Sequence, residues 1–569
     1  MEPNKIHRRR IRVLIGAIVV IGVVIIGRLF SLQIIHKEDY TERAERQYIT
    51  PSNTSFDRGT IFFTKKDGST MAAATIAKGY KVAITPRLIT NPEETFSALN
   101  TIVPLDHDSF IEKANKKADP YEEVAERLDR IQADAITALK LPGVTLYPQK
   151  WRLYPGEELA AQAIGFVSYK GDDLVGRYGL ERQYNDVLAR GSDTFYVNFF
   201  AEIFANVQST LFENKAVSGD IVSTIEPTVQ SQLETVIATV QQRWGSDAVG
   251  GVIMDPFTGE IVAMAHVPTF NLNEYNKVKN ISTYNNPFAQ DVYEMGSIIK
   301  PIVMAGALDV GAVTPQTTYV DEGFVKVQDR TFYNFDKKGR GRVSMQEVLN
   351  QSLNTGMVFV EQKMGKDAFK DYMLNKYRLG EKTGVDLPGE INGLVSSLKT
   401  PNDVNYASSS FGQGIATTPI NIVRAYAALA NGGTLVVTHL IKEIQKENGL
   451  TKTLTYPSTA GVLTTETTNT ITNMLVTVVD KGYHRGLPHY SVAAKTGTAQ
   501  MARPDGGGYY DDRNFHSLIG YFPAYQPRYV LYLFNNFPKG ASFSSQTLAD
   551  PFFEMVQFLT SYYEITPDR

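Results

Sequence analysis

The sequence has 569 residues, with 57 lysines and arginines against 60 aspartates and glutamates and a formal net charge of −3. This balance excludes a basic nucleic-acid-binding protein, and the length predicts about three to five domain-sized units. Hydrophobic residues make up 43% and charged residues 21% of the chain, which is typical of a folded protein. Because the chain contains no cysteine, disulfides, thiolate catalysis and cysteine-ligated metal sites are excluded.

The N-terminal segment predicts a membrane anchor. A basic tail at 1–12 precedes an apolar run at 13–35, which is interrupted by Arg28 near its far end. A helix over this run reaches about 34 Å, enough to cross a hydrocarbon core of about 30 Å. A cleavable signal peptide is the alternative, but no small-residue cleavage site follows the run. The positive-inside rule then predicts a single-pass protein of the inner (cytoplasmic) membrane, with its N-terminus in the cytoplasm and the remainder outside.

The segment 36–235 is predicted to form an extended α+β platform without catalytic machinery. Short β-like runs occur at 61–63 and 80–84, with turn residues between them. The range 119–141 predicts a helix, because it opens with an aspartate cap and a proline and continues with apolar residues at helical spacing.

The segment 236–569 is predicted to be one α+β domain. Apolar runs at 250–254 and 261–265 flank a turn and predict a hairpin, and two further strands are predicted at 517–521 and 529–534. Helix-rich stretches separate the two pairs. Both ends of the segment would therefore close one antiparallel sheet flanked by helices.

Ser297 and Lys300 form a Ser-x-x-Lys pair that predicts a nucleophile and its base. On a helix, residues three apart lie about 5 to 6 Å apart at Cβ, so the amine can reach the hydroxyl and take its proton. Pro301 directly after the lysine predicts a tight or distorted first turn. The pair alone is weak evidence, because Ser396 and Lys399 form a second copy in a predicted loop.

Two further motifs follow the first pair in order. Ser352-Leu353-Asn354 is the only Ser-x-Asn in the chain, and it lies in a stretch predicted to be helical. Lys495-Thr496-Gly497-Thr498 comes later and is preceded by a Val-Ala-Ala run that suits an edge strand. A second Lys-Thr-Gly, at 382–384, stands in polar surroundings and out of order. The ordered triple is far more specific than any of its parts.

The three motifs resemble the signature of penicillin-binding serine acyltransferases and serine β-lactamases. The whole chain resembles a class B penicillin-binding protein of the division type, which is a monofunctional peptidoglycan D,D-transpeptidase. The other matching motifs begin at Arg58, Arg152, Gly179, Asp255, Phe411 and Ala430. The resemblance implies four parts, which are a cytoplasmic tail at 1–12, a transmembrane anchor at 13–35, a pedestal or dimerisation-type domain at 36–235 and a transpeptidase domain at 236–569 with a five-stranded antiparallel sheet.

The resemblance also implies a role for each reacting residue. Ser297 would attack the penultimate D-alanine carbonyl of a stem peptide, and Lys300 would act as its base. Ser352 would pass the proton to the leaving group, and Asn354 would hold the lysine and the substrate amide. Lys300 is a base only when it is neutral, and burial near a second cation such as Lys495 would lower its pKa in that direction.

The Lys-Thr-Gly segment is implied to bind the substrate. Lys495, Thr496 and Thr498 would hold the terminal carboxylate, and Gly497 would leave room for the substrate along the strand. Backbone N–H groups of Ser297 and Thr498 would form the oxyanion hole. No metal and no cofactor are expected to take part.

Three departures from the family pattern are Met295, Ile298 and Ala494, where the family usually has proline, threonine and glycine. None of the three removes a reacting group. We expect Ile298 and Ala494 to reshape the pocket and with it the sensitivity to β-lactams.

The implied ligands are peptidoglycan stem peptides and β-lactam antibiotics. The implied partners are the cytoplasmic membrane, a membrane-embedded glycan polymerase and other divisome proteins, with no nucleic acid. Four alternatives stay open, namely an elongation-type transpeptidase, a serine β-lactamase, a β-lactam sensor and a non-catalytic scaffold of wall synthesis. A β-lactamase is typically a secreted single domain and a sensor normally has several membrane spans, while the intact motifs argue against a scaffold.

Overall fold

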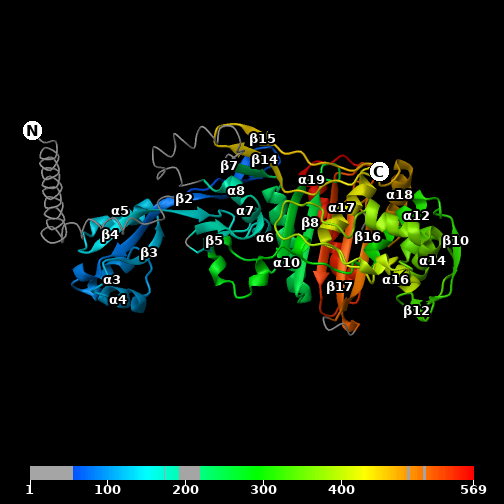
Figure 1. Ribbon diagram of the computed structural model, residues 1–569, viewed down its shortest axis with the longest axis horizontal. Helices are drawn as coiled ribbons and strands as arrows, with labels where there is room; N and C mark the ends of the chain where they lie inside the picture. The colour runs from blue at the N-terminus through cyan, green and yellow to red at the C-terminus, as the bar shows by residue number, and fades with distance from the viewer. Residues whose placement is uncertain (1–55, 172, 191–217, 483–486, 504–507) are drawn as a thin grey trace, which may run out of the picture. The chain divides into compact units, whose positions relative to one another are not determined.

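The computed structural model describes residues 56–171, 173–190, 218–482, 487–503 and 508–569 (Figure 1). The predicted tail at 1–12 and anchor at 13–35 lie outside these residues. Within the described part of the chain, none of the helices combines the length and the apolar character that crossing a membrane requires.

The chain divides into two compact units. The smaller unit contains Ala77–Trp151, and the larger unit contains Arg58–Ile76 and Arg152–Arg569. Strand β2 (Thr70–Ile84) contributes its first half to the larger unit and its second half to the smaller one.

The larger unit is built on a five-stranded antiparallel sheet in the order β16, β17, β18, β8, β9 (Figure 1). The strands are β8 (Ala248–Met254), β9 (Ile261–Val267), β16 (Ala493–Ala502), β17 (Tyr509–Phe522) and β18 (Tyr529–Asn536). Both ends of the segment 236–569, called the catalytic segment below, therefore supply strands, which confirms the predicted sheet.

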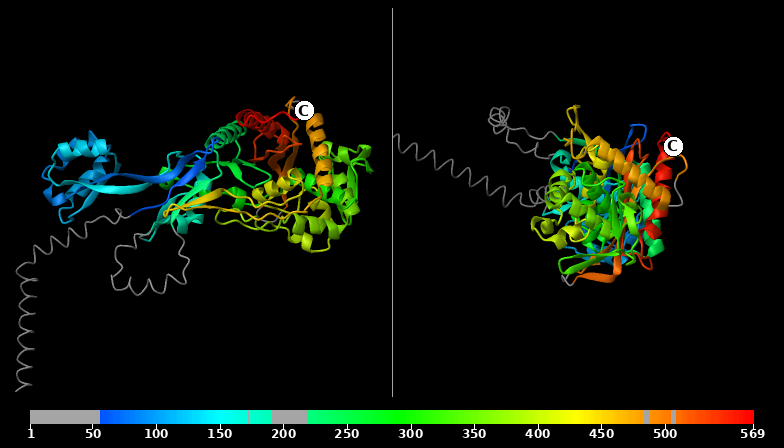
Figure 2. Two further views of the ribbon diagram at one scale, coloured as in Figure 1. Left: turned by 90° about the horizontal axis from the view of Figure 1, so that it is seen from above. Right: turned by 90° about the vertical axis from the view of Figure 1, so that its right-hand side faces the viewer.

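Helices cover both faces of this sheet because successive side chains of a strand point to opposite sides. Leu531 and Leu533 pack in one buried cluster, together with residues of α10 (Pro227–Trp244) and α19 (Ser544–Tyr562). These two helices lie side by side, as Figure 2 shows in green and red. Tyr532 packs in the other buried cluster. The main helices of that cluster are α12 (Lys300–Asp309), α14 (Asn354–Met364), α17 (Pro419–Ala430) and α18 (Thr465–Gly482).

A second sheet in the larger unit joins the platform segment to the catalytic segment. Strand β1 (Ile61–Thr64) pairs with β2 and with β7 (Gly219–Ser223), and β7 pairs with β14 (Ile441–Lys446). The compact units therefore divide elsewhere than at residue 235, and the boundary given by the sequence stays a prediction. The other strands of this unit are β5 (Val167–Lys170), β6 (Asp173–Gly176), β10 (Thr318–Asp321), β11 (Phe324–Val327), β12 (Arg330–Tyr333), β13 (Gly341–Ser344) and β15 (Thr451–Thr453).

Shorter helices complete the larger unit. They are α6 (Ala161–Ile164), α7 (Gly179–Gln183), α8 (Asn185–Leu188), α11 (Pro287–Gln290), α13 (Met345–Asn350), α15 (Lys366–Lys370) and α16 (Asp403–Ser409).

Three of the motifs noted in the sequence meet in one buried charge cluster. The carboxylate of Glu181 accepts a hydrogen bond from Nε of Arg58 at 2.6 Å and another from Nε of Arg152 at 2.6 Å. Burial alone would raise the pKa of Glu181, but the two guanidinium groups hold it below its usual value. The arginines and the glutamate are all buried, so this cluster fixes three distant segments of the chain to one another.

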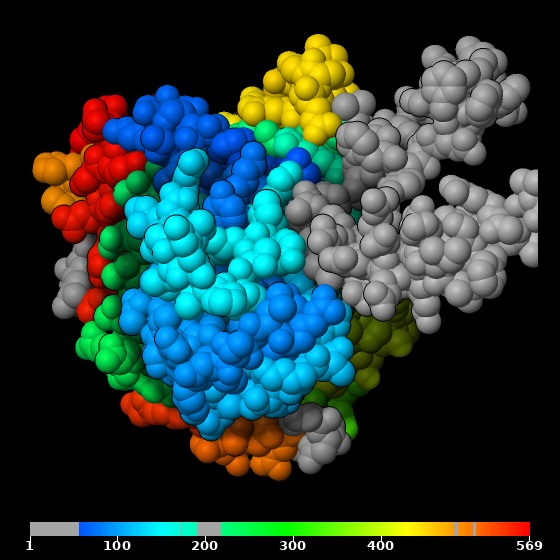
Figure 3. All heavy atoms as spheres, turned by 90° about the vertical axis from the view of Figure 1, so that its left-hand side faces the viewer, coloured from blue at the N-terminus to red at the C-terminus, as the bar shows by residue number. Residues whose placement is uncertain are grey.

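The smaller unit combines strands with short helices. Strands β3 (Glu122–Leu128) and β4 (Val144–Leu153) both pair with β2. The helices are α3 (Pro92–Asn100), α4 (His107–Asn115) and α5 (Arg130–Ala138). In Figure 3 the blue segment that holds α3 and α4 lies beside the cyan segment that holds β4.

The predicted helix at 119–141 is wrong in its first half. Residues Glu122–Leu128 form β3 because they pair with β2, and this pairing overrides the helical spacing of the apolar residues. The helix begins only at Arg130, where Asp129 accepts a hydrogen bond from the backbone N–H of Gln132 and forms a capping box with it. The runs at 61–63 and 80–84 do form strands, as the sequence predicts.

Candidate active site

Ser297 lies in a short 3-10 helix, η7 (Gly296–Ile299), which continues directly into α12. The tight first turn expected from Pro301 is therefore confirmed. A Cβ atom on Gly296 would come within 3.0 Å of the carbonyl oxygen of Thr498. The helix that carries the serine thus packs backbone to backbone against the strand that carries the Lys-Thr-Gly motif.

Lys300 is completely buried at the junction of η7 and α12. Its Nζ lies within hydrogen-bonding distance of Oδ1 of Asn354 at 2.8 Å, of Oγ of Ser352 at 3.2 Å and of the backbone oxygen of Ser352 at 2.5 Å. In the described part of the chain no hydrogen bond joins Lys300 to the Ser297 hydroxyl. Such contacts are often long before substrate binds, so this geometry is compatible with a lysine base.

Both lysines of the site titrate below their usual range. Burial and the nearby charge of Lys495 hold the pKa of Lys300 well below its ordinary value. Burial also lowers the pKa of Lys495 to about 8. The lowering shifts Lys300 toward its neutral, basic form, whereas Lys495, with a pKa of about 8, remains mostly charged at pH 7 and can bind a carboxylate.

Ser352 lies in a turn between α13 and α14, so its predicted place inside a helix is wrong. Its φ of +56° falls in the left-handed region, which a residue with a side chain rarely adopts. The buried side chain of Leu353 and a backbone hydrogen bond from Leu353 to Val348 hold the turn, and α14 begins at Asn354. This turn aims the carbonyl and hydroxyl of Ser352 and the amide of Asn354 at the same lysine.

Strand β16 carries the Lys-Thr-Gly motif along the edge of the sheet, as predicted. Thr496 and Thr498 are half-buried, and both line the pocket. The hydroxyl of Thr498 accepts a hydrogen bond from the backbone N–H of Ser544 at 3.1 Å. That Gly497 leaves room for substrate along the strand stays a prediction. A Cβ there would lie 2.7 Å from the carbonyl oxygen of Met295, so the glycine permits close packing of β16 against the serine helix.

The motif residues surround a cavity of about 560 Å³. Ser297, Ser352, Asn354, Lys495, Thr496 and Thr498 all line it. The cavity is large enough for a peptide end or a drug-sized molecule, since ligand pockets typically measure about 300 to 1,000 Å³.

The three departures from the family pattern lie behind this cavity. Met295, Ile298 and Ala494 are each at most 1% exposed, and none of them lines the pocket. That Ile298 and Ala494 reshape the pocket stays a prediction. Any influence on ligand binding has to pass through the packing of η7 and β16.

The two decoy motifs differ from the true ones in burial and partners. Ser396 and Lys399 are exposed on a four-residue 3-10 helix, whereas Lys300 is completely buried. In the second Lys-Thr-Gly, the backbone N–H and hydroxyl of Thr383 both donate to the carboxylate of Glu390 at 2.6 Å. Neither decoy lines the cavity.

The cavity wall also includes residues outside the three catalytic motifs. Phe411 and Gln413 belong to a motif already noted in the sequence. The remaining wall residues of this kind include Phe335, Arg340, Gln351, Phe543 and Ser544. Their identity follows from three-dimensional proximity, which no local pattern reports.

A half-buried serine, a fully buried lysine base and a second lysine facing the same cavity define the active site of a serine acyl-transferring enzyme. Residues 249–556 match the penicillin-binding protein transpeptidase domain, and residues 55–224 match the penicillin-binding protein dimerisation domain. The chain belongs to the penicillin-binding protein family, and it is a transpeptidase of that family's class B.

Named relatives cover almost the whole chain. The stage V sporulation protein D of Bacillus subtilis is 29% identical over 96% of this chain and 84% of its own length. The peptidoglycan D,D-transpeptidase FtsI of Escherichia coli K12 is 26% identical over 96% of this chain and 90% of its own length. A crystal structure of penicillin-binding protein 3 from Mycobacterium tuberculosis, complexed with aztreonam, covers 90% of this chain and 98% of that chain with a TM-score of 0.68. At 24% identity this last likeness shows the fold alone.

Proposed function

We propose that this enzyme cross-links peptidoglycan stem peptides by serine acyl transfer on the outer side of the cytoplasmic membrane, in septal wall synthesis. The observation that carries the proposal is the buried amine of Lys300, held by Ser352 and Asn354 one helical turn from Ser297. The lowered pKa of Lys300 favours the neutral amine that can take a proton from Ser297. The two residues lie on the same continuous helical segment.

The reaction proceeds in two halves. Oγ of Ser297 attacks the carbonyl carbon of the penultimate D-alanine while its proton passes to Lys300. The bond to the terminal D-alanine breaks, and Ser352 relays the proton to the departing amine. An amine from a neighbouring strand then attacks the ester, forms the new peptide bond and releases Ser297.

The cavity wall supports both halves. Lys495, Thr496 and Thr498 bind the terminal carboxylate, and the backbone N–H groups of Ser297 and Thr498 stabilise the oxyanion. A β-lactam has a carboxylate and a strained amide in the corresponding positions, so it acylates Ser297 covalently.

Labelling with fluorescent penicillin tests the reaction. Wild-type protein should take up stable label, and Ser297→Ala should take up none. Ser396→Ala, in the exposed second Ser-x-x-Lys, is the matched control and should label like wild type. An unlabelled wild type would refute the proposal, whereas label that turns over rapidly would favour a β-lactamase.

The division role and the membrane location rest on separate support. The basic tail and apolar run of 1–35 support a single-pass anchor. The resemblance of the sequence motifs to the division-type subfamily supports a role beside a glycan polymerase and other divisome proteins, and the relative FtsI is itself named a peptidoglycan D,D-transpeptidase. An elongation-type transpeptidase is the second candidate, since both roles use the same acyl-transfer chemistry. A fluorescent fusion at midcell supports the division role, and one along the sidewall supports elongation.

A further inference from the structure

We propose that Asp321, Asn334 and Thr355 form a buried positioning triad that sets the geometry of the Ser352–Asn354 turn. None of the three touches the cavity, and each is at most 4% exposed. The inference rests on the proposed function, because it assigns these residues an effect on Ser297 acylation that passes through Asn354, Ser352 and Lys300.

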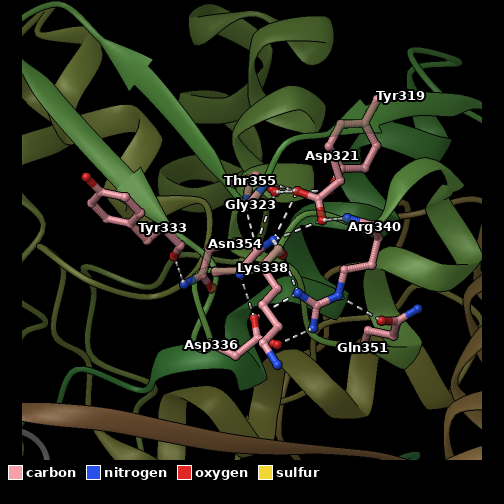
Figure 4. A network of polar contacts seen from close by, with 11 residues as sticks. Tyr319, Asp321, Gly323, Tyr333, Asp336, Lys338, Arg340, Gln351, Asn354 and Thr355 are labelled. Carbon is pink, nitrogen blue, oxygen red and sulfur yellow. Dashed lines mark hydrogen bonds and ion pairs between the residues drawn. The ribbon is translucent and has the colours of Figure 1, made fainter.

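The carboxylate of Asp321 is saturated with donors. Its Oδ1 accepts from the hydroxyl of Thr355 at 2.8 Å and from the backbone N–H of Gly323 at 3.0 Å (Figure 4). Its Oδ2 accepts from the backbone N–H of Arg340 at 3.0 Å, and the amide of Asn334 donates to both oxygens at 3.0 Å. A buried carboxylate with this many donors has one stable position, so it is a fixed reference point for its neighbours.

Thr355 connects this carboxylate to the catalytic turn. It directly follows Asn354 at the beginning of α14, and its backbone N–H donates to Oδ1 of Asn334 at 3.3 Å. Its hydroxyl is also within 3.0 Å of the hydroxyl of Tyr319. The first turn of the helix is therefore held by side chains of β10 and of the excursion 322–340, the segment that connects β10 to β13.

The same excursion holds Asn354 from its other side. The backbone oxygen of Tyr333, the residue before Asn334, accepts a hydrogen bond from Nδ2 of Asn354 at 3.0 Å (Figure 4). This contact leaves Oδ1 of Asn354 free to point at Lys300, from which it accepts at 2.8 Å. The excursion thus sets the orientation of the Asn354 amide, and this orientation places its oxygen against the amine of Lys300.

A strained turn needs such support. Ser352, two residues before Asn354, has a φ of +56°, and a serine stays in this region only where its surroundings leave no alternative. If the triad is broken, the turn can relax toward ordinary backbone angles. The carbonyl, hydroxyl and amide that hold Lys300 would then no longer converge on its amine.

The test measures the rate constant of acylation by fluorescent penicillin together with the final fraction of labelled protein. Thr355→Val keeps the shape of the side chain but removes the hydroxyl, and Asp321→Asn removes the charge. Both should acylate at least tenfold more slowly than wild type, while Thr355→Ser should restore the rate to within threefold. Asp329→Asn, on the exposed turn between β11 and β12, is the matched control and should behave like wild type.

The two readouts separate positioning from folding. A purely structural role would lower the labelled fraction but leave the rate of the labelled molecules unchanged, and this result would overturn the triad. A Thr355→Ser protein as slow as Thr355→Val would overturn it as well. If wild type labels and the variants match its rate, only the positioning role fails, whereas an unlabelled wild type overturns both this inference and the proposed function.

Discussion

The rate of acylation should fall at alkaline pH because Lys495 loses its charge there. Its pKa of about 8 results from burial, and its side chain faces the cavity in which a ligand carboxylate would lie. With this pKa, about nine tenths of Lys495 is charged at pH 7 and about one tenth at pH 9. For a ligand with a carboxylate, the second-order rate constant should therefore fall about tenfold between these two pH values.

At acidic pH the rate of acylation should change in the opposite direction and rise with pH. Lys300 has to be neutral to take the proton of Ser297, so the rate should rise as the pH passes upward through the lowered pKa of Lys300. The pH–rate profile should therefore be bell-shaped. Because the charge of Lys495 itself contributes to the lowered pKa of Lys300, the two apparent pKa values of this profile describe the pair of lysines and not either lysine alone.

Lys495→Arg isolates the alkaline limb. Arginine stays charged to above pH 12, so the variant should acylate more slowly overall but keep the same rate constant at pH 7 and pH 9. Lys382→Arg, in the decoy Lys-Thr-Gly, should keep the wild-type profile. The assay is stopped-flow acylation by fluorescent penicillin between pH 5.5 and 9.5, with thermal melting as a check on folding. A wild-type rate constant that is flat or rises between pH 7 and 9 would refute the reasoning, as would a parallel fall in Lys495→Arg.

Three further substitutions have defined outcomes. Glu181→Ala leaves two buried arginines without their carboxylate and should lower the free energy of unfolding by about 3 to 5 kcal/mol, measured by denaturant titration, whereas exposed Glu158→Ala should change it little. Gly497→Ala places a Cβ 2.7 Å from the carbonyl of Met295 and should slow acylation at least tenfold by moving the serine helix from the strand, seen in the same labelling assay. Lys300→Arg places a larger and permanently charged group at this buried site, so it cannot act as a base; its acylation rate should fall by about 10² to 10⁴, and its melting temperature should fall as well because the new charge is buried near Lys495.

The chemistry of the site could be predicted because its reacting residues occur in short sequence motifs. Ser297, Ser352 and Lys495 were each found from a few neighbouring residues, and their order along the chain separated them from the decoys at Ser396 and Lys382. The structure adds that burial distinguishes the two kinds of copy, since the true lysines are at most 2% exposed. Burial depends on distant segments, so it could not be read from the motif itself.

The positioning triad could not be predicted for a related reason. Asp321, Asn334 and Thr355 lie up to 34 residues apart, and each is an ordinary polar residue in its own surroundings. They meet only because β10 and β13 pair and return the chain to the beginning of α14. Polar contacts of this kind depend on how distant segments of the chain pair, whereas the Ser-x-x-Lys contact depends only on the spacing of residues along one helix.

The fold was predicted best where the two ends of the catalytic segment close the sheet. Apolar runs and turn residues marked those strands, and tertiary contacts did not change them. The failure at 122–128 shows the limit, because apolar residues at helical spacing also fit a strand once β2 offers a partner. Local spacing is a weak constraint wherever a neighbouring strand can satisfy the backbone hydrogen bonds.

The position of the nucleophile depends on glycines whose missing side chains allow close backbone contacts. A Cβ at Gly296 would meet the carbonyl of Thr498, one at Gly412 would lie 2.1 Å from the carbonyl of Gly296, and one at Gly497 would meet Met295. The serine helix, the Phe411–Gly414 loop and the edge strand therefore touch through their backbones. An oxyanion hole made from backbone N–H groups on two of these segments needs their spacing fixed to a few tenths of an ångström, and only residues without a side chain allow that approach. The reacting side chains are thus carried by segments that contact one another through their backbones.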